Sequence, residues 1–231
     1  ACLQTTFMNK QLADNLQKSL GISLEQIVRE EYEMIILKAL FESELGKSFV
    51  FKGGTALRLA YGSTRFSEDL DFSVVEKFDK EALDKLLKSI VNQYEALALV
   101  DVRQKFFTYF ALFKVKEDFT FQAFSIKFEA SIRPVDWQKD KDYQLLALSS
   151  KVTNLTVLAQ VASLERIKQE KLSIDPPRVR DLFDLWFIGQ KSGKATPMYF
   201  KGWDIRVVRR ELHKFLPEQD RRLLEQWLPE K

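Results

Sequence analysis

Two neighbouring motifs between residues 50 and 74 constrain the fold of this chain more than any other feature. The first begins with the apolar residues 49–51, continues through Gly53-Gly54-Thr55, and ends in the apolar-periodic segment 56–60. This order predicts a strand, a glycine turn and a helix. Glycine lets the backbone approach an anion closely, and the free N–H groups at a helix start point toward it. The first motif therefore predicts a phosphate-binding turn.

The second motif is the alternating sequence Asp-Leu-Asp-Phe-Ser-Val at residues 69–74. Strict alternation predicts a strand with Asp69, Asp71 and Ser73 on one face and apolar side chains on the other. Two carboxylates side by side on a rigid strand repel each other, and a divalent cation relieves that repulsion. Mg²⁺ prefers one or two carboxylates together with phosphate oxygens of a substrate. The motif therefore predicts Asp69 and Asp71 as metal ligands.

The composition argues against several other classes of site. The chain has 231 residues, of which 45% are hydrophobic, which is enough for a core in one large domain or two small ones. A single cysteine, Cys2, and a single histidine, His213, argue against a disulfide framework, a cysteine zinc site and a histidine-dependent triad. No apolar run is long enough to span a bilayer, which favours a cytoplasmic protein without a membrane partner. The net charge of +3 neither requires nor excludes a nucleic-acid partner.

The remaining pattern predicts an α/β (α+β) fold, with a mixed β-sheet flanked by helices and a helical C-terminal part. The polar segment 134–155 is predicted to be a loop. We expect it to connect a catalytic half, residues 1–150, to a mainly helical half, residues 151–231, that completes the active site. Further strands are expected within 100–105, 109–116, 119–133 and 156–161. Helices are expected at 7–20, 24–40 after the N-cap Ser23, 80–98 after the N-cap Asp79, 164–173, from Asp175-Pro176 onward, 205–216 and 220–228.

The two opening motifs together resemble the nucleotidyltransferases of the AbiEii/AbiGii toxin type, within the polymerase-β-like nucleotidyltransferase superfamily. The family pattern Lys-Gly-Gly-Thr-Ala-Leu matches residues 52–57, and Arg-x-Ser-x-Asp-Leu-Asp-Phe matches residues 65–72. The resemblance implies a nucleotidyltransferase-like sheet, an NTP substrate and Mg²⁺ or Mn²⁺ as the cofactor. It also assigns nucleotide-binding residues: Lys52, Gly53, Gly54 and Thr55 around the phosphates, and Arg65 and Ser67 against the triphosphate.

The superfamily takes a third carboxylate from a later strand. Within the alternating segment 119–133, Glu129 lies on the polar face, opposite a face of apolar side chains. The resemblance implies that Glu129 joins Asp69 and Asp71 at the metal. An ordinary solvent-facing pair of Lys127 and Glu129 on a half-buried strand is the alternative.

A second match lies in the C-terminal half. Family members carry a Glu-Lys-Leu motif, here Glu170-Lys171-Leu172, and then an Arg-Asp-aromatic-x-Asp type of motif, to which residues 178–185, Arg-Val-Arg-Asp-Leu-Phe-Asp-Leu, correspond. The resemblance implies that Lys171 neutralises charge on the phosphoryl oxygens and that Asp181 or Asp184 orients it. The two aspartates share a helix face, so the choice stays open. A surface lysine beside ordinary helix-face ion pairs is the alternative, and Lys168 is a competing lysine one turn earlier.

The function implied by this resemblance is a Mg²⁺-dependent toxin that moves a nucleotidyl group from an NTP to an RNA, with tRNA as the favoured acceptor. Such a toxin belongs to a toxin–antitoxin or phage-defence system and has a winged-helix antitoxin as its genetic partner. Two alternatives remain open: an enzyme that transfers AMP to a protein side chain, and a non-catalytic nucleotide- or RNA-binding module of the same fold. Label from an NTP in RNA, in protein or in neither distinguishes the three.

Overall fold

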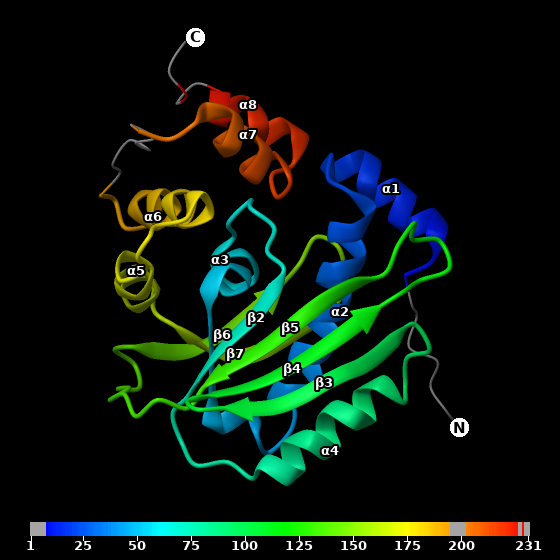
Figure 1. Cartoon of the computed structure of the whole chain (residues 1–231), viewed down its shortest axis with the longest axis vertical. Coiled ribbons are helices and arrows are strands. Elements are labelled where there is room, and N and C mark those ends of the chain that lie inside the picture. The colour runs from blue at the N-terminus through cyan, green and yellow to red at the C-terminus, as the bar shows by residue number, and fades with distance from the viewer. Residues whose placement is uncertain (1–7, 195–201, 226–227, 229–231) are drawn as a thin grey trace.

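The computed structural model describes residues 8–194, 202–225 and 228, so Cys2 lies outside the described residues. The core of the fold is a seven-stranded mixed sheet with the order β3-β4-β5-β2-β1-β7-β6 (Figure 1). The strands run Phe49–Lys52 (β1), Asp69–Val74 (β2), Leu97–Lys105 (β3), Thr108–Val115 (β4), Phe124–Ser131 (β5), Tyr143–Ser149 (β6) and Thr156–Ala162 (β7).

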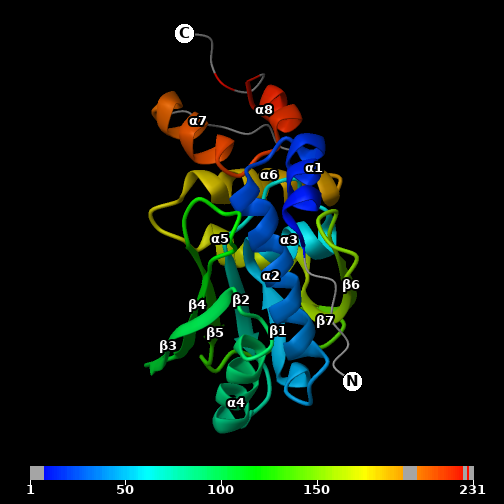
Figure 2. The same ribbon diagram turned by 90° about the vertical axis from the view of Figure 1, so that its right-hand side faces the viewer.

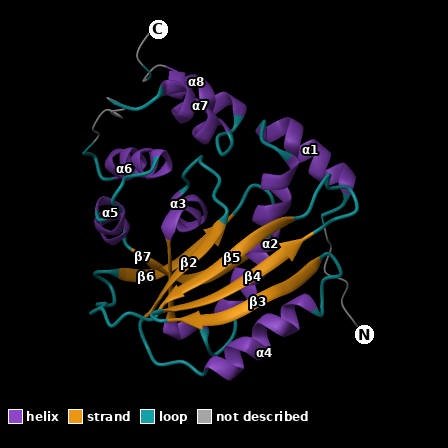
Figure 3. Cartoon of the chain, viewed as in Figure 1, coloured by secondary structure: helices purple, strands orange, loops and turns teal. Residues whose placement is uncertain are grey.

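Helices lie around the sheet, as Figure 3 shows by colour. They run Lys10–Leu20 (α1), Leu24–Phe41 (α2), Gly53–Tyr61 (α3), Lys80–Val91 (α4), Leu164–Leu172 (α5), Val179–Lys191 (α6), Ile205–His213 (α7) and Glu218–Glu225 (α8), with a 3-10 turn at Gly46–Ser48. In both Figure 1 and Figure 2, α7 and α8 lie at one end of the molecule and α4 at the other. The expected fold class, a nucleotidyltransferase-like mixed sheet flanked by helices, is confirmed.

Capping side chains explain where several helices begin. Ser23 accepts a hydrogen bond from the backbone N–H of Gln26 at the start of α2, and Asp79 accepts two from the first turn of α4. Both N-caps were expected from the sequence and are confirmed. α2 packs across β7 and β5. It also buries charged residues that its pattern did not predict, among them Arg29 and Glu33.

Central strands bury aromatic side chains that stack across the sheet. The rings of Phe72 on β2 and Phe128 on β5 lie 4.6 Å apart, and those of Phe51 on β1 and Phe72 lie 5.4 Å apart. Each of these three phenylalanines is almost completely buried. Aromatic burial of this kind stabilises a sheet strongly, so β1, β2 and β5 form a rigid platform for the polar residues on the opposite face.

Three predicted boundaries are wrong. The helix expected at 80–98 ends at Val91, because residues from Leu97 onward pair with β4 as β3. Residues 134–155 are not all loop, since they contain β6. β6 is an edge strand in which only Tyr143 and Leu148 are buried, so it lacks the alternation that reveals a strand. The helix expected from Asp175-Pro176 begins at Val179, because Pro177 disfavours helical backbone at the residue before it.

The β6–β7 hairpin spans residues 143–162 and therefore crosses the expected boundary at residue 150. β7 also pairs with β1 in a parallel arrangement, with Phe51 opposite Val161. Strands from both sides of that boundary thus belong to one sheet. A second apolar cluster joins the sheet to the C-terminal helices: Val50 of β1 is buried together with Ile167 of α5 and Phe183 of α6.

Candidate active site

The strand register brings the predicted acidic residues together. Asp71 on β2 lies opposite Glu129 on β5 and opposite Lys52 on β1, and Asp69 lies opposite Lys127. Residues paired across strands point to the same face of a sheet. Asp69, Asp71 and Glu129 accordingly line one pocket, and Lys127 Nζ lies 3.5 Å from Asp69 Oδ1.

The surroundings of Asp71 disfavour the ionised form of its carboxyl group. Burial, followed by the negative charges of Asp69 and Glu129, raises its pKa to about 6. Within the described residues, no three His, Cys, Asp or Glu side chains are grouped tightly enough to hold a metal ion by themselves. Mg²⁺ does not require such a cage, because it commonly takes one or two carboxylates plus phosphate oxygens and water. A divalent cation that arrives with a nucleotide therefore fits this donor set.

The glycine pair allows the start of α3 to approach these carboxylates. Gly53 has a φ of +80°, a backbone conformation that residues other than glycine rarely adopt. A Cβ at Gly53 would overlap the carboxylate of Asp71. A Cβ at Gly54 would overlap the guanidinium of Arg65 and lie 2.8 Å from Ser67 Oγ. The turn is thus packed tightly against protein side chains as well as facing the pocket.

The other predicted nucleotide-binding residues differ in how they are held. Thr55 is buried, and its hydroxyl donates to the carbonyl of Asp69 at 2.6 Å, which fastens α3 to the start of β2. Lys52 lines the pocket, and its Nζ lies 2.9 and 3.0 Å from the two carboxylate oxygens of Glu170 on α5. Ser67 also lines the pocket.

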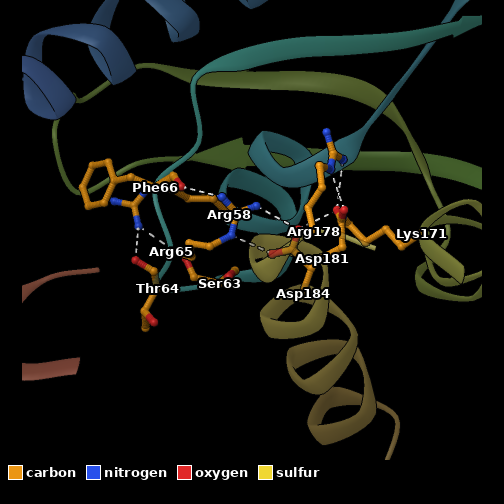
Figure 4. Close-up of polar contacts among 9 residues, drawn as sticks. All are labelled: Arg58, Ser63, Thr64, Arg65, Phe66, Lys171, Arg178, Asp181 and Asp184. Atoms are coloured by element: carbon orange, nitrogen blue, oxygen red, sulfur yellow. Dashed lines mark hydrogen bonds and ion pairs between the residues drawn. The ribbon is translucent and has the colours of Figure 1, made fainter. Parts of the chain in front are cut away.

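Arg65 belongs to a buried charge network that joins the N-terminal and C-terminal parts of the site (Figure 4). Its Nε and Nη2 each donate to the carboxylate of Asp184 at 2.8 Å, and its Nη1 donates to the carbonyl of Phe66. The side chains of Arg65 and Asp184 are 2% and 1% exposed. The bidentate pair holds the segment before β2 against α6 and places the arginine behind Gly54.

Lys171 lies between both candidate aspartates, as Figure 4 shows. Its Nζ is 3.0 Å from Asp181 Oδ1 and 2.6 Å from Asp184 Oδ2. Arg178 holds the other side of Asp181, with Nε 2.6 Å from Oδ2. Both aspartates contact the lysine and both are buried; Asp181 lines the pocket, whereas Asp184 is also held by Arg65.

The network keeps both aspartates ionised. Burial alone would raise the pKa of Asp181, but hydrogen bonds from Arg178 and the charge of Lys171 overcome it, so its pKa lies below the usual range. Burial of Asp184 is likewise outweighed by the charges of Arg65 and Lys171, which lower its pKa. The carboxylates fix the position of the Lys171 ammonium, and an ammonium fixed in advance can stabilise charge on a phosphoryl group.

Three charged residues that line the pocket are not predicted as site residues by the sequence: Glu170, Arg178 and Arg180. Glu170 is part of the motif that identifies Lys171, and Arg178 lies one helical turn before Asp181, so the ion-pair spacing was the available signal. Lys168, the competing lysine, has a 40% exposed side chain 4.0 Å from Glu165.

None of the described helices is long and apolar enough to cross a membrane.

The solved structures that are similar to this chain include the following two. JHP933 from Helicobacter pylori superposes with a TM-score of 0.53 at 26% sequence identity, which covers 73% of this chain and 68% of that one. MenT4, the nucleotidyltransferase toxin Rv2826c from Mycobacterium tuberculosis H37Rv, superposes with a TM-score of 0.56 at 19% identity, covering 88% of this chain and 68% of that one. A search of curated proteins found no match. These likenesses show the fold.

The family is established by sequence. The family model described as the nucleotidyl transferase AbiEii toxin of type IV toxin–antitoxin systems matches residues 35–227. The chain belongs to this family, as its two opening motifs predicted. The match also extends beyond the segment that carries those motifs, into both α2 and the C-terminal helices.

Proposed function

We propose that the protein transfers a nucleotidyl group from an NTP to a hydroxyl of RNA in a reaction that depends on Mg²⁺ or Mn²⁺. One observation carries this proposal: Asp69, Asp71 and Glu129 line the same pocket as the Gly53-Gly54 turn and Lys171. Clustered carboxylates repel phosphate unless a cation intervenes. A site that combines them with a phosphate-binding turn and a fixed ammonium is suited to a metal-bound triphosphate.

In the proposed reaction, the acceptor hydroxyl forms a bond to the α-phosphorus and the bond from the α-phosphorus to the β-phosphate oxygen breaks. Pyrophosphate leaves and takes up the proton. A cation held by Asp69 and Asp71, with Glu129 beside them, would neutralise the triphosphate and activate the attacking oxygen. The N–H groups at the start of α3 orient the phosphates. Lys171 stabilises charge that builds on the phosphoryl oxygens, and Asp181 and Asp184 keep the lysine in place.

The family supports the proposed biological setting. Because AbiEii proteins are toxins of type IV toxin–antitoxin systems, an antitoxin is the expected partner, and we propose a separately encoded winged-helix protein in that role. We further propose tRNA as the acceptor, phage defence as the setting and the cytoplasm as the site of action.

The test compares transfer of two radiolabels. Purified protein is incubated with total RNA, cell lysate protein and each NTP labelled at either the α- or the γ-phosphate, with Mg²⁺, with Mn²⁺ or with EDTA. Nucleotidyl transfer predicts α-label in RNA, no γ-label, and loss of labelling with EDTA. Incorporated γ-label would contradict nucleotidyl transfer. Incorporation of α-label into protein alone would favour AMP transfer to a side chain and would overturn RNA as the acceptor.

A further inference from the structure

Helices cover only part of the sheet face that carries the catalytic carboxylates. Over β1, helices α5 and α6 bury Val50 against Ile167 and Phe183. Beyond β2, in the direction of β5, β4 and β3, none of the described helices lies in front of the strands in Figure 1. Asp69 and Asp71 on β2 therefore mark the line where the covered part of the face meets the exposed part.

The strand register extends the site across the exposed part in two rows. From Asp71 the first row passes through Glu129 on β5 and Phe110 on β4 to Arg103 on β3. A second row leads from Asp69 through Lys127 and Leu112 to Asp101. We call the exposed side chains of β3, β4 and β5 on this side the open face. It includes Arg103, Lys105, Phe110, Leu112, Lys114 and Lys127.

The open face differs in chemistry from the back of the same strands. On β4, the back-facing residues Tyr109, Ala111 and Phe113 are fully buried, whereas Phe110 and Leu112 on the open face are only half-buried. The side chains of Lys127 and Arg103 are 50% and 49% exposed. Lys105 and Lys114 are exposed as well. The open face thus combines a half-buried aromatic ring with four basic side chains.

These basic side chains are only partly neutralised by neighbours. Arg103 pairs with Asp101 at 3.1 Å and also lies 5.1 Å from the centre of the Phe110 ring. Lys127 lies 3.5 Å from Asp69. Basic side chains and a flat aromatic side chain therefore lie together on this face, and Phe110 is flanked by Arg103 on β3 and by Glu129 of the catalytic carboxylates on β5. Single-stranded nucleic acids are recognised by this combination, because bases stack on aromatic rings while basic residues follow the phosphates.

We infer that the open face binds a single-stranded segment of the RNA acceptor and leads its reacting hydroxyl to Asp69 and Asp71. The inference rests on the proposed function and adds where the acceptor lies. In-line displacement requires the attacking oxygen and the leaving pyrophosphate to lie on opposite sides of the α-phosphorus. The Gly53-Gly54 turn and Lys171 hold phosphates on the covered side, so the acceptor approaches from the open face.

The dimensions agree with a short single strand. Neighbouring strands lie ~4.8 Å apart, so the three steps from β2 to β3 span roughly 14 Å, which accommodates a few nucleotides. Phe110 is placed one strand beyond Glu129, where it can stack against a base near the reacting end of the acceptor.

The test uses paired charge reversals on opposite faces of the protein. Lys105→Glu with Lys114→Glu alters the open face, and Lys85→Glu with Lys88→Glu, on exposed positions of α4, makes the same change in net charge elsewhere. A third variant, Phe110→Leu, keeps an apolar side chain but removes the ring. Binding of a fluorescein-labelled single-stranded RNA oligonucleotide is measured by anisotropy over a range of salt concentrations. Thermal shift with Mg²⁺ and a non-hydrolysable NTP measures folding and nucleotide binding.

The open-face reversal is expected to weaken RNA binding at least ~10-fold and to reduce the slope of log K against log salt by ~1.4, the contribution of two phosphate contacts on a single strand. Phe110→Leu is expected to weaken binding by ~10-fold, in the range for one stacked base. The α4 reversal should bind RNA as wild type does, and all variants should keep the thermal shift with nucleotide. Equal RNA affinity in the two reversal variants would overturn the inference.

Labelling assays separate this inference from the proposed function. If wild type labels RNA but the open-face reversal has an unchanged KM for RNA, the open face is not the acceptor site although the function stands. If wild type labels only protein, the proposed RNA acceptor is wrong. A raised KM for RNA with an unchanged KM for NTP supports the open face.

Discussion

Replacing Lys171 tests whether the buried charge network acts in catalysis as proposed. Lys171→Met keeps the length of the side chain and removes the ammonium, which lies 3.0 Å from Asp181 and 2.6 Å from Asp184. Because the Lys171 side chain is only 8% exposed, water cannot take the place of the ammonium beside the two carboxylates. We expect the transfer rate to fall at least ~100-fold, the loss typical of one preorganised electrostatic donor.

The same change also affects stability, and the structure sets its size. Breaking a buried ion pair costs about 3–5 kcal/mol when a carboxylate is left uncompensated. Here Asp184 keeps Arg65 and Asp181 keeps Arg178, so the lower end, about 3 kcal/mol, is expected. For a domain of this length that corresponds to a decrease in Tm of roughly 6–12 °C.

The assay is incorporation of α-labelled NTP into RNA at a temperature where melting curves show each variant to be folded. Lys168→Met is the matched control, because that lysine is exposed and its ion pair with Glu165, at 4.0 Å, is long. Lys171→Arg should not restore the rate, since a planar guanidinium cannot occupy the position of one ammonium between two carboxylates. A folded Lys171→Met protein with the wild-type rate would refute the role of Lys171, and a rate loss shared by Lys168→Met would refute its specificity.

Three further predictions concern the surroundings of this lysine. Arg65→Met should destabilise the protein by about 3–5 kcal/mol in urea unfolding, because Asp184 loses its bidentate partner in a buried site; a change below 1 kcal/mol would contradict it. Asp184 has a lowered pKa, so the stability that its carboxylate contributes is fully present above the unfolded pKa of about 3.9 and is lost as the pH falls through the folded pKa. Asp184→Asn removes this carboxylate. Melting curves from about pH 6 to about pH 3 should therefore show a smaller acid-induced decrease in Tm for Asp184→Asn than for wild type. Gly54→Val should lower both Tm and NTP affinity, because its side chain overlaps Arg65 and Ser67, and an unchanged Tm would show that the turn can relax.

Local patterns predicted the central part of the site because each motif is contiguous in sequence. Alternation placed Asp69 and Asp71 on one strand face, and the register with β5 brings Glu129 to the same face. The position of Arg65 could not be predicted in this way. Its partner Asp184 is 119 residues away in sequence, so only the packing of α6 shows that the arginine holds the carboxylate behind the glycine turn.

The boundaries that were wrong also have physical causes. A helical rhythm at residues 83–94 predicts a helix but does not show where it ends, and the pairing of Leu97 with Val115 decides that α4 stops at Val91. β6 is hidden for a different reason. It is stabilised by hydrogen bonds to β7 at the edge of the sheet and buries little of its own side-chain surface, and Leu145 is 62% exposed.

The most direct test of the proposed catalytic centre is the initial rate of α-label incorporation into RNA by wild type and by Asp71→Asn, measured side by side with Mg²⁺ at a temperature where both are folded. Asparagine preserves the shape of the side chain and removes the charge that would hold the cation. Since metal-ion catalysis supplies several kcal/mol of transition-state stabilisation, a decrease of at least ~1,000-fold is predicted. A folded Asp71→Asn protein that labels RNA at the wild-type rate would contradict the assignment of Asp69, Asp71 and Glu129 as the catalytic centre.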